Sequence, residues 1–250
     1  RFLVEALPEL SRARVKTLLD DGRVRVDGKR LRKGDPVSAG AVVEIRGELP
    51  QQDFSPREDP SISLVVRYDD PAVVVLDKPA GMPTHPLRPD ETGTLANAIL
   101  TRYPETSEVG FHLREPGLLH RLDTDTSGLV IVARNKAAFE SLRNASKSGD
   151  VQKRYLALVE GRGSAEGVVD LPLVPHRKDP RRVEVVTEHV RLRAGTKTHD
   201  ARTEYRVARA LGDFTLLEVE VTRAFRHQVR AHLAHIGHAL IGNFVHQSGH

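Results

Sequence analysis

The chain has 250 residues, enough for one large domain or for a large domain with a smaller one. It contains no cysteine, which excludes a disulfide framework and a thiolate metal site and fits a reducing compartment such as the cytoplasm. Because no apolar run approaches the roughly 18 residues of a membrane span and no signal peptide is recognisable, a membrane protein is not expected. Arginine supplies 29 of the 38 basic residues, and the formal net charge is +4. The excess of arginine over lysine is explained either by phosphate contacts or by a GC-rich coding sequence.

Residues 1–50 are expected to form a small separate domain. Ser11 can cap a helix that begins at Arg12, and Gly22 follows the end of that helix. Two short strands flank the turn at residues 27–28, and residues 41–45 read as another strand. The segment carries 11 basic and 8 acidic residues, so it holds three of the four net positive charges. Its basic side chains are expected to bind RNA phosphates; they are Arg12, Arg14, Lys16, Arg23 and Arg25.

Strand and helix patterns alternate in the remainder of the chain. Residues 51–63 are polar and contain proline, so they are expected to link the first domain to a second one at residues 64–250. Strands are predicted at residues 65–68, 72–76, 129–133, 155–159, 203–209 and 215–222, and helices at 94–102, 136–145 and 227–235. This order predicts an α+β fold, with a mixed, mostly antiparallel sheet flanked by helices and a small α/β domain before it.

Residues 120–128 are the most informative segment of the sequence. They place Arg121 and Asp123 in a small, turn-prone segment immediately before a β-branched strand. A carboxylate at such a place is expensive to bury unless it is paired or functional. Chemistry alone leaves Asp125 as a rival candidate, and it also leaves open a surface turn in which Asp and Thr side chains bond their own backbone.

The first 48 residues resemble the S-four-like RNA-binding domain, which is named after a ribosomal protein. The resemblance rests on residues 1–3, 11–15, 22–29 and 43–45, where the helix cap, the arginine spacing and the hairpin turn agree. It implies RNA binding and does not specify a reaction.

Four segments in the rest of the chain resemble the RluA-type pseudouridine synthases, in order and spacing: residues 76–86, 117–133, 153–161 and 227–234. Together with the N-terminal domain, the chain resembles the branch that modifies large-subunit ribosomal RNA. The resemblance implies an isomerase that detaches uracil from its ribose, rotates it and rejoins it through carbon 5, without a cofactor or metal. Ribosomal RNA is favoured over transfer RNA as the partner, and a cytoplasmic monomer is expected.

The same resemblance implies roles for individual residues. Asp123 matches the catalytic aspartate, which either stabilises or adds to the cationic sugar or removes a sugar proton. Arg121 matches a residue that enters the RNA stack as the uridine leaves; a plain phosphate contact is the alternative. Tyr155 matches a tyrosine that lies against the base, and Arg230 matches the arginine that pairs with the catalytic carboxylate. The remaining expected RNA contacts are Lys78 and His227.

The C-terminal part departs from the family pattern. Residues 223–226 replace the usual Thr-Gly-Arg-Thr or Thr-Gly-Arg-Lys, residues 237–239 and 242–247 differ as well, and the family's final segment has no counterpart. The departures favour two alternatives: a weak or inactive RNA-binding homologue that acts in ribosome assembly, or a hydrolase that stops after cleavage. His232, His235 and His238 are spaced by three but lack an acidic or thiolate companion, so a metal site is not expected.

Overall fold

The computed structural model describes residues 2–6, 12–47, 54–162, 165–177, 179, 182–190, 192 and 195–242, without the side chains of residues 4, 5 and 12–14. The chain divides into two compact units, Arg1–Asp53 and Phe54–His250. No helix in the described part of the chain is long and apolar enough to cross a membrane.

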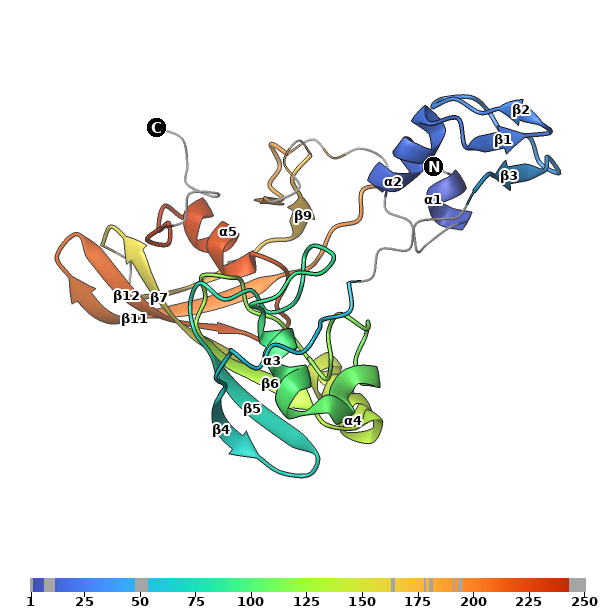
Figure 1. Ribbon diagram of the computed structural model, residues 1–250. Helices are drawn as coiled ribbons and strands as arrows, with labels where there is room; N and C mark the ends of the chain where they lie inside the picture. Colours follow the sequence, from blue (N-terminus) through green and yellow to red (C-terminus); the bar gives the residue numbers. More distant parts are fainter. Residues whose placement is uncertain are drawn as a thin grey trace. The chain divides into compact units, whose positions relative to one another are not determined.

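The N-terminal unit packs two helices against a three-stranded antiparallel sheet (Figure 1). Its elements are α1 (Phe2–Ala6), α2 (Arg12–Asp20), β1 (Val24–Val26), β2 (Lys29–Arg30) and β3 (Val43–Ile45), with the strand order β2-β1-β3. The core is built from Leu3, Val15, Leu18, Val24 and Leu31. The predicted helix and hairpin are present, and the predicted cap at Ser11 lies outside the described residues. Helix α1 was not predicted, because five residues are too few to display a helical period.

The second unit contains two larger antiparallel sheets (Figure 1). The first sheet has the order β4-β5-β6 and consists of β4 (Val65–Asp69), β5 (Val73–Lys78) and β6 (Gly128–Ala133). The second has the order β7-β12-β11-β8 and consists of β7 (Lys153–Glu160), β8 (Glu166–Asp170), β11 (Arg202–Leu211) and β12 (Phe214–Val221). A small two-stranded sheet adds β9 (Leu173–Pro175) and β10 (Val183–Val185). The helices are α3 (Leu95–Arg102), the short 3-10 helix η1 (Pro104–Glu108), α4 (Lys136–Ser148) and α5 (Gln228–His235).

The α+β prediction is confirmed, and all strand pairs among the described residues are antiparallel. Every helix and strand predicted for the second unit is present, with bounds that differ by at most three residues. Elements β8, β9, β10 and η1 were not predicted, because such short segments carry weak periodicity.

Helices α3 and α4 both pack on the first sheet. The capping box of Thr94 starts α3, which packs Leu95 and Ile99 against Leu76 of β5. Helix α4 buries Phe139 against Ala133 at the end of β6. Helix α3 thus packs on β5, and α4 packs at the C-terminal end of β6.

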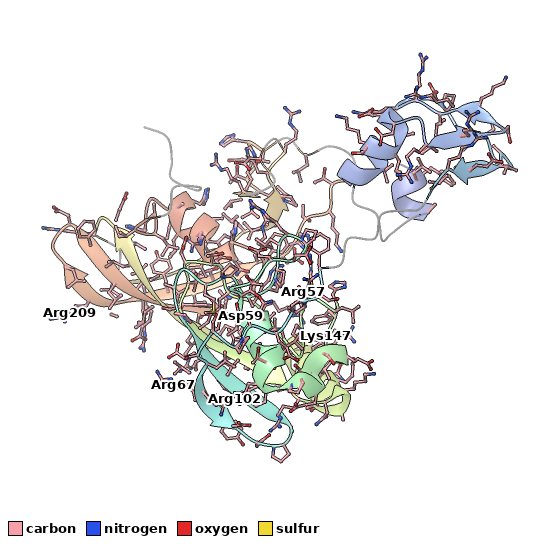
Figure 2. The ribbon with its side chains drawn as sticks, in the orientation of Figure 1. Arg57, Asp59, Arg67, Arg102, Lys147 and Arg209 are labelled. Carbon is pink, nitrogen blue, oxygen red and sulfur yellow. The ribbon has the colours of Figure 1, made fainter. Side chains whose placement is uncertain are left out.

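Residues 54–63, which were expected to belong to a linker, lie in the second unit and contact α3 (Figure 2). The Asp59 backbone N–H donates to Thr101 Oγ1 at 2.8 Å, and the Asn97 side chain donates to the Arg57 carbonyl at 2.7 Å. Polar groups of the helix thus supply hydrogen-bond partners that a linker pattern in the sequence does not reveal.

The second sheet is covered by α5, which packs Leu233 against Val159 and Leu217. Tyr155 on β7 packs against this core and also against the core of the first sheet. The two sheets therefore meet at Tyr155, and the functional side chains predicted in the second unit gather around that junction.

Candidate active site

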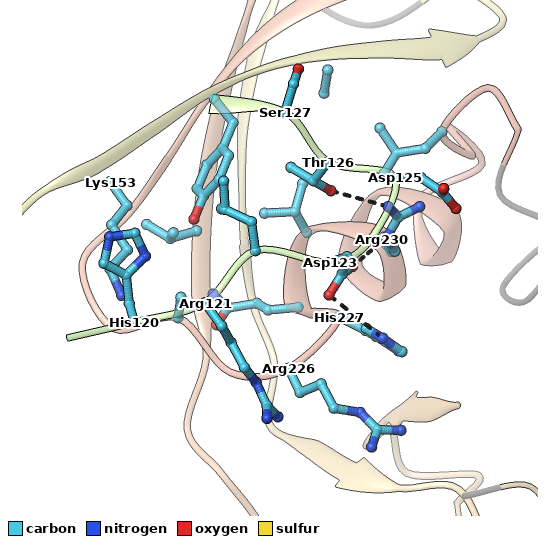
Figure 3. Close-up of a pocket in the computed structure, with 18 of the residues that line it drawn as sticks. His120, Arg121, Asp123, Asp125, Thr126, Ser127, Lys153, Arg226, His227 and Arg230 are labelled. Carbon is cyan, nitrogen blue, oxygen red and sulfur yellow. Dashed lines mark hydrogen bonds and ion pairs between the residues drawn. The ribbon is translucent and has the colours of Figure 1, made fainter. Parts of the chain in front are cut away.

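An open cavity of about 640 Å³ lies where the segment before β6 meets β7 and α5 (Figure 3). Five of the predicted site residues line it: Arg121, Asp123, Tyr155, His227 and Arg230. They come from three parts of the chain that are far apart in sequence, so the fold assembles them.

Asp123 and Arg230 form the central pair of this cavity. Arg230 Nε donates to Asp123 Oδ2 at 2.8 Å, and Arg230 Nη2 donates to Thr126 Oγ1 at 3.3 Å. His227 Nε2 lies 3.8 Å from the other carboxylate oxygen, Oδ1 (Figure 3). The Asp123 side chain keeps 36% of its surface exposed. A charge-assisted bond thus fixes the direction of a carboxylate that still faces solvent and a ligand.

Asp125, the rival carboxylate, lines the same cavity but is exposed. Within the described residues it makes no ion pair, whereas Asp123 has Arg230 beside it. The geometry therefore favours Asp123 as the oriented carboxylate, which spacing in the sequence could not decide.

Lys78 was predicted to contact RNA, and that prediction is wrong. Its side chain is fully buried, and Nζ donates to the carbonyls of Pro79 at 2.9 Å, Met82 at 2.7 Å and Thr124 at 3.0 Å. Burial lowers its pKa, and the nearby charges of Asp123 and Asp125 act in the opposite direction. A buried ammonium with three carbonyl partners does not reach a phosphate; it fixes the loop that carries Asp123.

Lys78→Met is expected to destabilise the protein by about 2–4 kcal/mol, because three carbonyls then lose a buried charged donor while the apolar stem is kept. Urea unfolding monitored by circular dichroism measures this loss. The control Lys136→Met removes an exposed lysine and should leave the midpoint unchanged. An unchanged midpoint in Lys78→Met would contradict the structural role of Lys78.

A second set of hydrogen bonds holds the segment that carries Asp123. Thr84 Oγ1 donates to the Leu122 carbonyl at 2.7 Å, and the Leu122 N–H donates back to the same hydroxyl at 3.2 Å. The Gly81 N–H donates to the Thr124 carbonyl at 2.9 Å. The segment after β5 therefore fixes the backbone on both sides of Asp123.

Tyr155 and Arg121 also line the cavity. Burial raises the pKa of the Tyr155 hydroxyl, and the charge of Asp123 raises it further, so the phenol stays protonated near neutral pH. Arg121 is exposed and makes no ion pair within the described part of the chain. The cavity thus offers a neutral phenol ring and a guanidinium without an ion pair among the described residues.

His120 is a largely buried histidine next to Arg121. Its Nε2 accepts the Ile131 N–H at 3.2 Å, which ties the catalytic segment to β6. Burial, together with the charge of Lys153, lowers its pKa from 6.5 to about 4. The imidazole is therefore neutral in the folded protein at neutral pH.

Because the pKa of His120 is lower in the folded state, protonation favours the unfolded state. The stabilising effect is complete above the unfolded value of 6.5 and is lost as the pH falls towards 4. The stability advantage of wild type over His120→Gln is expected to shrink by about 3 kcal/mol between pH 7 and pH 4. Urea titrations across this window measure it, with the exposed His112→Gln as control. A constant difference between wild type and His120→Gln would refute this assignment.

Residues 223–226, which depart from the family pattern, lie just before α5 and shape its start. The Phe225 ring stacks on His199 at 4.1 Å between centroids, and the Phe225 N–H donates to Gln228 Oε1 at 2.9 Å. His227 has a left-handed backbone with φ 56° at the N-terminus of the helix. This geometry places His227 beside Asp123 and aligns the helix that carries Arg230.

The basic residues of the N-terminal unit have different surroundings. Lys16 on α2 is exposed, while Arg23 Nε donates to the Arg46 carbonyl at 2.8 Å and Arg25 Nη1 donates to the Gly28 carbonyl at 2.7 Å. The other two predicted contacts, Arg12 and Arg14, lie in α2, and their side chains are outside the described atoms.

Thr126 and Lys153 also line the cavity and were not predicted from sequence. Thr126 accepts from Arg230, and burial lowers the pKa of Lys153. Thr126 belongs to the segment singled out above, but nothing in its spacing indicates a partner on α5. His232 serves the core instead, since its ring nitrogens lie 2.8 Å from Thr203 Oγ1 and 3.0 Å from the Leu171 carbonyl.

An oriented carboxylate in an open, arginine-lined cavity, preceded along the chain by a small basic unit, is the arrangement that an enzyme acting on RNA requires. Comparison with known proteins identifies which one. Residues 72–235 match the family model described as RNA pseudouridylate synthase, and residues 1–43 match the S4 domain. The chain belongs to the RNA pseudouridylate synthase family and is an RNA pseudouridine synthase, an isomerase with an N-terminal S4 domain.

Individual relatives agree with this assignment. An uncharacterized RNA pseudouridine synthase of Chloroflexus aurantiacus is 39% identical over 98% of this chain and 73% of its own length. The ribosomal large subunit pseudouridine synthase D of Xanthomonas campestris is 34% identical over 96% of this chain and 68% of its own length. The structure titled human RNA Pseudouridylate Synthase Domain Containing 1 superposes with a TM-score of 0.59 at 23% identity, covering 74% of this chain and 70% of that one, which supports the fold.

Proposed function

We propose that this protein converts uridine to pseudouridine in large-subunit ribosomal RNA, with Asp123 as the catalytic carboxylate. The observation that carries the proposal is the 2.8 Å bond from Arg230 to Asp123 inside a cavity that Tyr155 also lines. Relatives named ribosomal large subunit pseudouridine synthase D support the choice of ribosomal RNA over transfer RNA. The proposal includes a cytoplasmic monomer in which residues 1–50 bind RNA and the second unit, which begins at Phe54, performs the reaction.

The reaction breaks the bond between ribose C1′ and uracil N1 and forms a bond from C1′ to uracil C5; C5 loses its proton and N1 gains one, so the product is an isomer of uridine. Positive charge develops on the sugar as the first bond breaks, so an anion close to C1′ lowers the barrier. Asp123 supplies that anion, whether it adds to C1′ or takes a sugar proton. Arg230 directs the carboxylate, and the protonated Tyr155 lies against the uracil ring while it turns.

The target base has to leave its stack before it reaches Asp123. Arg121 stands at the cavity wall with no competing ion pair among the described residues, so its planar cation can occupy the vacated space. His227 adds a contact to the nucleotide near the carboxylate. In the N-terminal unit, the arginines and Lys16 bind RNA phosphates. The contribution of these contacts to RNA affinity falls with rising salt.

Unmodified large-subunit ribosomal RNA transcripts labelled with tritium at uridine C5 test the proposal. Release of tritium is expected, and transfer RNA transcripts serve as the comparison. Free uracil would indicate the hydrolase alternative, and RNA binding without release would indicate the assembly factor. Either result would overturn the proposal, and release from transfer RNA alone would overturn the choice of substrate.

A further inference from the structure

A second, smaller pocket of about 220 Å³ adjoins the catalytic cavity. The two share three lining residues, Leu119, His120 and Arg121. The other residues of the second pocket are His85, Phe111, Glu115 and Leu118. An RNA strand that places a uridine beside Asp123 passes Arg121, so the neighbouring nucleotide comes within reach of this pocket.

His85 gives the second pocket a polar group without a hydrogen-bond partner. Its side chain is only 4% exposed, yet within the described residues neither ring nitrogen has a hydrogen-bond partner. Glu115 Oε1 lies 3.8 Å from Nε2, which is too long for a hydrogen bond. An imidazole buried in this way carries a desolvation cost that a bound ligand can offset.

The protonation state of His85 defines what it can offer. Burial lowers its pKa, the charge of Glu115 opposes this, and Arg114 and Arg121 add to the lowering. The ring is therefore neutral near pH 7 and offers one N–H donor and one nitrogen acceptor.

Glu115 and Phe111 complete the chemistry of the pocket. The Glu115 carboxylate is 14% exposed and can only accept hydrogen bonds. The Phe111 ring meets Phe139 edge-on at 4.9 Å between centroids, and it remains 48% exposed at the rim of the pocket. An aromatic face of this kind is a common platform for an unstacked base.

The position of the pocket is fixed relative to the reacting carboxylate. Thr84, the residue before His85, is bonded in both directions to Leu122, which precedes Asp123. A base bound at His85 therefore also fixes the spacing between its nucleotide and the carboxylate.

We propose that this pocket binds the base of the nucleotide adjacent to the target uridine and selects a base with an exocyclic amino group over uracil. The inference rests on the proposed function for the position of the target. Glu115 accepts from the amino group, His85 bonds the adjacent ring nitrogen or carbonyl, and Phe111 stacks on the ring. Uracil is disfavoured because, in the same pose, its O4 carbonyl replaces the amino group, and two acceptors, O4 and the Glu115 carboxylate, then face each other.

Hairpin RNAs whose loop carries one uridine test the selection, with each of the four bases placed in turn on its 5′ and 3′ sides. Affinity is measured by fluorescence anisotropy and turnover by tritium release. At one of the two positions, uracil is expected to weaken binding about tenfold relative to cytosine, within the range for a paired base edge. Glu115→Gln should reduce this preference to about twofold or less, because an amide pairs with amino and carbonyl groups alike.

His85→Leu is a second variant and should also lose the base preference. Its thermal unfolding midpoint reports whether the variant folds. If His85→Leu does not fold, Glu115→Gln remains the decisive variant. His112→Gln, an exposed residue of the same loop, should keep the full preference. Equal affinity for all four bases at both positions, or an undiminished preference in Glu115→Gln, would overturn the inference. Because affinity is read separately, a base preference without tritium release would overturn the proposed function alone.

Discussion

Asp123→Asn is expected to lower kcat by about 10³–10⁴-fold while RNA affinity stays near that of wild type. The amide keeps the shape and its oxygen can still accept from Arg230, but it carries no negative charge for the sugar and accepts no proton. Single-turnover tritium release measures the chemical step, and filter binding measures affinity. Retained affinity separates a lost reaction from a lost fold.

Asp125→Asn is the matched control for this variant, since it removes an exposed carboxylate of the same cavity two residues away. Its kcat should stay within about threefold of wild type. If Asp125→Asn were the inactive variant and Asp123→Asn the active one, the assignment of the catalytic carboxylate would be reversed.

Arg230→Ala is expected to lower kcat by about 100-fold with KM changed by no more than about twofold. Arg230 bonds Asp123 and Thr126, so its loss leaves the carboxylate without a fixed direction while the phosphate contacts remain. Arg230→Lys should lose about tenfold, because one ammonium does not reproduce the geometry of a guanidinium fork. Steady-state tritium release gives both constants.

Arg154→Ala serves as the control for Arg230, since Arg154 pairs with Glu220 on the exposed face of the second sheet. It should leave kcat unchanged. A rise in KM without a fall in kcat for Arg230→Ala would instead make Arg230 an RNA contact and contradict the positioning role.

The sequence predicts the elements that frame the site because their patterns are local. The continuous β-branched apolar runs of β5 and β6 each specify a strand within about ten residues, and the structure adds that Thr94 caps the predicted helix α3. The strands β8, β9 and β10 escape prediction because their positions depend on partners elsewhere in the fold.

The site itself is non-local, which limits what the sequence reveals. Arg230 reaches Asp123 across 107 positions in the chain, and no periodicity connects the two. Without the family resemblance, Asp123 and Asp125 stay equivalent candidates. The structure separates them only through the helix that carries Arg230.

Lys78 shows how residue type misleads when the face of a strand is ignored. Lysine is rarely buried, so an exposed phosphate contact was the natural prediction. Along β5, however, Lys78 follows Val74 and Leu76 at the period of two that marks the buried face. Because Val73 and Val75 are apolar as well, the sequence alone does not show which face of β5 is buried, and the structure does.

The central claim is that this chain isomerises uridine and that Asp123 performs the step. Chromatography of nucleosides from unmodified large-subunit ribosomal RNA transcripts tests it most directly, after incubation with wild type and with Asp123→Asn. Wild type should convert uridine to pseudouridine with no free uracil, and Asp123→Asn should leave the uridine intact. Absence of pseudouridine with wild type, or its formation by Asp123→Asn at the wild-type rate, would contradict the claim.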